Sequence, residues 1–76
     1  MTTNIKSMFS KMNDETREEA LHILMAEFGI DNKRYIKNNW LIGGRIPEDY
    51  QENIVNIFQN LLRVQHLKIM QIKVQL

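Results

Sequence analysis

The residues best suited to chemistry lie near the middle of the chain, where amide and cationic side chains gather in one short segment. Residues 32–38 read Asn-Lys-Arg-Tyr-Ile-Lys-Asn, and an arginine follows two glycines shortly afterwards. An arginine donates two hydrogen bonds to guanine and an asparagine pairs with adenine in the major groove of DNA. Lysine attracts phosphate, which adds affinity without sequence information. The segment therefore predicts contacts with nucleic acid through Asn32, Lys33, Arg34, Tyr35, Lys37, Asn38 and Arg45.

Each of these residue types also has a simpler interpretation. Lys33 and Arg34 also fit an ordinary solvated surface, and Tyr35 fits either the core or a contact with phosphate through its hydroxyl. Arg45 is either a phosphate clamp or an exposed loop residue. Trp40 is expected in the core rather than stacked on a base.

Contact residues need a rigid support, and apolar residues at helical spacing predict one. The predicted helices span residues 3–12, 14–28, 32–42 and 47–65. Gly29 ends the second helix in the left-handed conformation, and Asp31 is the expected N-cap of the third. Ile36 and Trp40, one turn apart, would hold that third helix against the domain. Pro47 suits the first position of the fourth helix.

The last ten residues, 67–76, are predicted to form a strand, with a continued helix as the alternative. Met70, Ile72, Val74 and Leu76 alternate with polar residues, as in a strand with one buried face. A lone strand leaves its backbone groups unpaired. We therefore expect these four residues to form a dimer interface with a second copy of the chain.

Composition indicates one small globular domain. The 76 residues are 43% hydrophobic and 25% charged, with a net charge of +1 and no cysteine. Acids dominate residues 13–27, whereas bases dominate residues 31–45 and 61–76. No apolar run approaches the ~20 residues of a membrane helix. The N-terminus lacks the apolar stretch of a signal peptide, so a cytoplasmic protein is expected.

Catalysis and metal binding are not expected. Glu15, Glu18 and Glu19 are predicted on an exposed helix face, where a carboxyl group lacks the enclosure that acid–base chemistry needs. His22 stands one turn from Glu18, but a metal site needs more ligands than this pair supplies. No nucleophile–base pair or phosphate-binding loop is present, so we expect no enzyme activity, cofactor or small-molecule substrate.

Two stretches carry a resemblance to a known family. Residues 27–31 read Glu-Phe-Gly-Ile-Asp, and residues 40–48 read Trp-Leu-Ile-Gly-Gly-Arg-Ile-Pro-Glu, with Ile36 and Ile54 at apolar positions around them. Together they resemble the Cro/repressor-like helix-turn-helix regulators of phages over residues 20–62. The segment from Gly29 to Trp40 is slightly longer than is usual in that family, through either a larger turn or a later start of the third helix.

The resemblance implies a fold and a function. The fold would be a mainly α, four-helix helix-turn-helix domain in which the third helix enters the major groove of double-stranded DNA. The protein would be a homodimeric repressor on a roughly palindromic operator, and in Cro proteins a C-terminal strand can pair across the dimer. The alternative is a small phage-encoded inhibitor or assembly factor that binds a protein through Met8, Met12 and the apolar tail.

Overall fold

The structure is a computed structural model that describes the backbone of residues 2–74 and the side chains of residues 4–70. The chain folds into α1 (Thr2–Ser10), α2 (Asp14–Phe28), the short α3 (Lys33–Tyr35), the π-helix η1 (Ile36–Ile42) and the long α4 (Glu48–Val74). No strand occurs in the described backbone. The predicted mainly helical class is confirmed. The predicted bounds of the first three helices agree with the structure to within about two residues.

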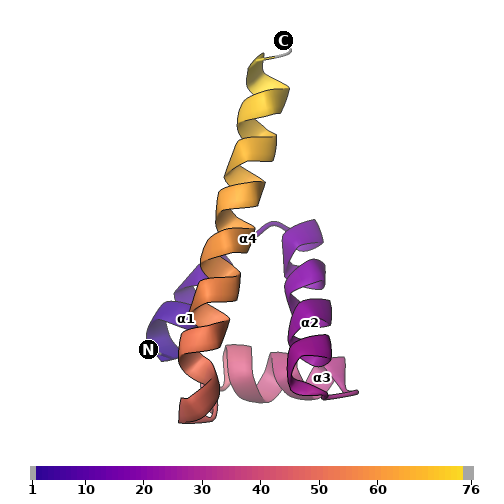
Figure 1. The fold of residues 1–76 in the computed structure, drawn as a ribbon, viewed down its shortest axis with the longest axis vertical. Coiled ribbons are helices and arrows are strands. Elements are labelled where there is room, and N and C mark those ends of the chain that lie inside the picture. Colours follow the sequence, from indigo (N-terminus) through magenta and orange to yellow (C-terminus); the bar gives the residue numbers. More distant parts are fainter. Residues whose placement is uncertain (1, 75–76) are drawn as a thin grey trace.

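The helices enclose one core beside the first half of α4. Figure 1 shows α1 and α2 alongside this half of α4, while the α3–η1 segment runs across one end of the domain. The fully buried side chains come from every long helix and from η1; the largest are Phe58, Ile5, Leu24, Ile36, Leu41 and Ile54. The second half of α4 extends beyond this core (Figure 1).

The two ends of α2 carry capping interactions that agree with its sequence. Asn13 is the N-cap, and its side chain accepts a hydrogen bond from the backbone N–H of Thr16 at 2.8 Å. Gly29 is left-handed, with φ of 65°, and the next residue, Ile30, donates its backbone N–H to the carbonyl of Met25 at 3.0 Å. These bonds satisfy backbone groups that a helix terminus leaves unpaired. They also fix the direction in which the chain leaves α2.

The predicted third helix is present, but most of it is a π-helix rather than an α-helix. Hydrogen bonds from residue i+5 to residue i give η1 about one more residue per turn than an α-helix. Ile36, Trp40 and Leu41 therefore all face the core, with at most 2% of each exposed. The α-helical spacing assumed from the sequence identified Ile36 and Trp40 but missed Leu41.

The end of η1 depends on Gly43. Its N–H donates to the carbonyl of Asn38 at 2.9 Å, which is the π-helical pattern. A Cβ atom on Gly43 would lie 2.9 Å from that same carbonyl oxygen, closer than side chains tolerate. Gly44 follows with φ of 70°, a left-handed conformation that disfavours other residues. The glycine pair thus allows the π-helix η1 to end within one turn.

The strand predicted for residues 67–76 is not observed. α4 continues as a helix through Val74, past the predicted end at residue 65, so the helical alternative applies to the described part of this segment. A helix satisfies its own backbone hydrogen bonds, whereas an unpaired strand does not. Met70 is exposed. The side chains of Ile72 and Val74, and all of Leu76, lie outside the described residues.

The π-helical register can be tested with two adjacent residues. Leu41 is 1% exposed and Ile42 is 54% exposed. We expect Leu41→Ala to lower the free energy of unfolding by about 2–5 kcal/mol because it leaves a core cavity. Ile42→Ala, the matched control, should change it by less than about 0.5 kcal/mol. Urea denaturation followed by circular dichroism measures both; equal effects would contradict the register.

Candidate nucleic-acid interface

The candidate contact residues surround the outer side of α3 and η1. Lys33, Arg34, Tyr35, Lys37 and Asn38 are all exposed, while Ile36 and Trp40 on the same segment are buried. Arg45, in the loop that follows η1, is also exposed. The segment therefore combines a rigidly packed inner face with an outer face rich in hydrogen-bond donors. This is the arrangement that reading a nucleic acid from a helix requires.

An aromatic cluster fixes the position of this segment. The rings of Phe28 and Trp40 meet edge to face with centroids 5.6 Å apart, and the rings of Phe28 and Tyr50 stack at 4.3 Å. Trp40 and Tyr50 are 5.8 Å apart. The three residues come from α2, η1 and α4, so the cluster joins the supporting helix, the candidate contact helix and the long helix. The expectation that Trp40 belongs to the core is confirmed.

Asn32 acts as a helix cap. Its side-chain oxygen accepts a hydrogen bond from the backbone N–H of Tyr35 at 3.0 Å, so Asn32, and not the expected Asp31, is the N-cap of α3. Sequence alone did not distinguish these neighbours because both residue types cap helices well. The cap occupies the acceptor group that Asn32 would otherwise offer to an adenine. Asn32 nevertheless remains exposed at the start of the contact segment.

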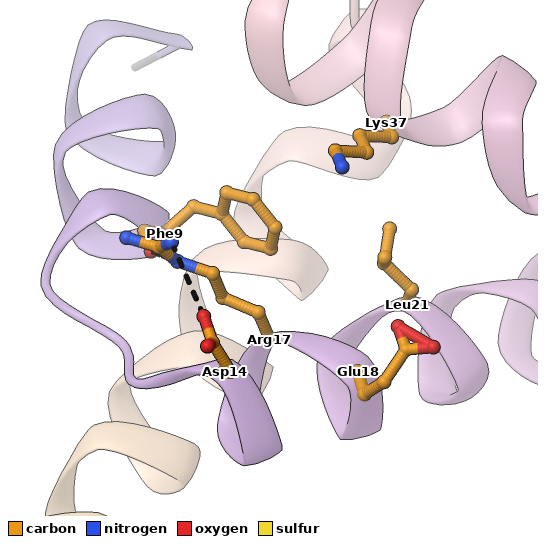
Figure 2. Close-up of a pocket in the computed structure, with 6 residues that line it drawn as sticks. All are labelled: Phe9, Asp14, Arg17, Glu18, Leu21 and Lys37. Atoms are coloured by element: carbon orange, nitrogen blue, oxygen red, sulfur yellow. Dashed lines mark hydrogen bonds and ion pairs between the residues drawn. The ribbon is translucent and has the colours of Figure 1, made fainter.

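Two of the candidate bases face the acidic half of α2. The ammonium nitrogen of Lys33 lies 2.6 Å from a carboxylate oxygen of Glu18. Lys37, one turn further on, lines a groove of about 310 Å³ together with Phe9, Asp14, Arg17, Glu18 and Leu21. Figure 2 shows the Lys37 side chain on one side of this groove, opposite the helix that carries Glu18. Lys33 and Lys37 thus form one flank of the candidate interface.

Arg34, Asn38 and Arg45 form no side-chain hydrogen bond or ion pair with any residue that the structure describes. The exposed Ile42 shares their segment, although the sequence did not single it out. Ile42 stands four residues after Asn38, so the two side chains lie on one face of the helix. The outer face of α3–η1 thus also includes Ile42. Lys33 and Lys37 form a separate flank that faces α2.

Arg17 has a structural role that the sequence did not reveal. Its guanidinium donates to the backbone carbonyls of Phe9 at 3.1 Å and Ser10 at 2.9 Å, and it lies 5.5 Å from the centre of the Phe9 ring. These bonds satisfy carbonyls at the end of α1 and join α1 to α2. The one base of the acidic segment is therefore occupied within the domain.

No group of three metal-ligating side chains occurs among the described residues. Within the same part of the chain, no helix is both long enough and apolar enough to cross a membrane.

Comparison with known proteins yields no relative: no family model, no curated protein and no solved structure matches this chain.

The capping role of Asn32 leads to a stability prediction. Asn32→Ala removes the acceptor for the Tyr35 N–H and should lower the free energy of unfolding by about 1 kcal/mol. Asn32→Ser should retain most of the stability because serine also caps helices. Asn38→Ala is the control, since the Asn38 side chain makes no hydrogen bond with the described residues. Thermal or urea unfolding would contradict the assignment if both alanine variants were equally stable.

Proposed function

We propose that this protein is a sequence-specific, DNA-binding transcriptional regulator, a Cro-like repressor of phage or mobile-element type. One observation carries the proposal. A donor-rich outer face on α3–η1 is held by an inner face that packs into the core through Ile36, Trp40 and Leu41. Such a helix can enter a groove of double-stranded DNA without losing its attachment to the domain. The absence of cysteine agrees with a role in a reducing cytoplasm, beside the DNA.

The contact residues divide into two chemical groups under this proposal. Arg34 and Asn38 are suited to base edges, because a guanidinium matches guanine and a side-chain amide matches adenine. Lys33 and Lys37 attract DNA phosphates. Arg45, in the loop after η1, reaches the sugar-phosphate backbone of the DNA. Tyr35, which is exposed, offers its hydroxyl to a phosphate, and Asn32 lies at the start of the segment.

The second half of α4 supports the proposal of a homodimer. Val64, Leu67, Ile69 and Met70 are each at least 40% exposed on this extension. A 76-residue chain buries only ~60% of its unfolded surface, so association adds substantial apolar burial. The proposed interface keeps the described part of the predicted segment, residues 67–74, but pairs it as a helix rather than as a strand. Two copies would place two reading helices on a roughly palindromic operator.

The exposed end of α4 also favours the second candidate function, a module that binds another protein. The methionines of the first predicted helix were the other candidate surface for binding a protein. They contribute little exposed surface, because Met12 is buried and Met8 is partly buried against the core. Pull-down from lysate with and without nuclease distinguishes the two functions. Protein partners retained after nuclease treatment favour the second candidate, and loss of all partners favours DNA binding.

DNA binding is tested by a salt-dependent titration of fluorescent duplexes. The combined Arg34→Ala and Lys37→Ala variant should weaken binding by tenfold or more, since a single arginine–guanine pair contributes roughly 1–3 kcal/mol. The matched control is Lys6→Ala with Lys11→Ala, which removes the same charge from α1 and the turn that follows it. Affinity that ignores salt, or that falls equally in both variants, contradicts the proposal.

The dimer is tested by sedimentation equilibrium. The wild-type protein should show the mass of two chains at high concentration, and Leu67→Ser should shift it towards the monomer. Ile42→Ser is the matched control, because Ile42 and Leu67 are almost equally exposed, at 54% and 52%. A wild-type monomer at all concentrations, or equal dissociation by both variants, would argue against pairing through α4.

A further inference from the structure

Glu18 is the one acidic side chain that the structure pairs with the candidate contact helix. Its carboxylate accepts a hydrogen bond from Lys33 at 2.6 Å, and both side chains remain about half exposed to solvent. Lys37 lies one helical turn beyond Lys33 and lines the same groove as Glu18 (Figure 2). Glu18 therefore pairs with one base, Lys33, and lies in the same groove as a second, Lys37; the sequence predicts phosphate contacts for both lysines.

The surrounding charges keep this carboxylate ionised. The hydrogen bond from Lys33 lowers the pKa of Glu18 below its usual value, although desolvation opposes this effect. Electrostatic interactions with Lys33, His22 and Lys37 lower the pKa of Glu18 further. At neutral pH Glu18 thus presents to Lys33 the same charge and oxygen acceptors that a DNA phosphate would present.

We infer that Glu18 competes with DNA phosphate for Lys33 and Lys37 and thereby determines how strongly this protein binds DNA of arbitrary sequence. The inference rests on the proposed function. A lysine held by Glu18 must leave this partner before it contacts a phosphate, so it contributes less to affinity than a free lysine. Arg34 and Asn38 make no such pair with the described residues, so base reading is unaffected. Glu18 would therefore improve specificity by weakening only the sequence-independent part of binding.

The test compares Glu18→Gln with Glu19→Gln. The two residues are neighbours on α2, both are exposed, and each substitution raises the net charge by one. Only Glu18 pairs with Lys33. Dissociation constants for a mixed-sequence duplex are measured from low to moderate salt. Glu18→Gln should tighten binding by roughly 1.5- to fivefold more than Glu19→Gln, the range expected when one exposed ion pair is removed. Its salt dependence should steepen by about one phosphate contact.

A Lys33→Ala background shows whether the effect passes through Lys33. In this background, Glu18→Gln should lose most of its advantage over Glu19→Gln, because the competing pair no longer exists. Urea denaturation of every variant separates this effect from a change in folding.

The outcomes of the test are distinct. Equal affinities for Glu18→Gln and Glu19→Gln, with wild-type protein that binds DNA, would overturn the inference and leave the proposed function standing. Weaker binding by Glu18→Gln would also overturn it, because Glu18 would then position Lys33 rather than compete for it. No DNA binding by the wild type or by either variant would contradict the proposed function and this inference together.

Discussion

The contact between three aromatic rings determines how the candidate contact helix is presented. Phe28 of α2, Trp40 of η1 and Tyr50 of α4 lie with ring centroids 4.3 to 5.8 Å apart. Pairs of this kind contribute roughly 0.5–1.5 kcal/mol each beyond the area that they bury. For a chain of this size such contributions are a large share of the total stability. Together with the buried Ile36 and Leu41, this cluster fixes the orientation of the outer face of α3–η1 relative to α2.

The π-helix follows from the same requirement for packing. Ile36, Trp40 and Leu41 are all buried, and the wider turn of a π-helix brings them onto a narrower face than an α-helix would. The segment from Gly29 to Trp40 contains two distinct features. The turn from Gly29 leads to a helix that begins at Lys33, and η1 then holds an extra residue in its turn. π-helical turns are rare in proteins, and those that occur are often found at functional sites.

Local chemistry made most of the fold predictable from the sequence. The Gly29 terminus of α2 was predicted from the sequence and is confirmed; the Asn13 cap and the Gly43–Gly44 stop likewise depend on only a few neighbouring residues. Leu41 was missed because the usual helical period was assumed for residues 36–42. The strand predicted at the end of the chain is wrong for the residues up to Val74, which are helical. A short segment of alternating apolar and polar residues fits a helix as well as a strand.

The candidate site was predictable only as a set of residues. Which bases remain free depends on how α2 and α3 cross, and no local pattern states that Glu18 reaches Lys33 fifteen residues later. The same is true of Arg17, whose bonds to the end of α1 depend on the turn between the helices. The set that emerges has Arg34, Asn38 and Arg45 outward, with Lys33 and Lys37 on a flank facing α2.

The most direct measurement is the titration of ¹⁵N-labelled protein with a mixed-sequence DNA duplex, followed by the backbone amide resonances. If α3–η1 reads DNA, the largest shifts should fall on residues 33–45, while the amides of α1 and the second half of α4 change little. The absence of shifts at low salt, or shifts confined to the second half of α4, would contradict the DNA-binding interface.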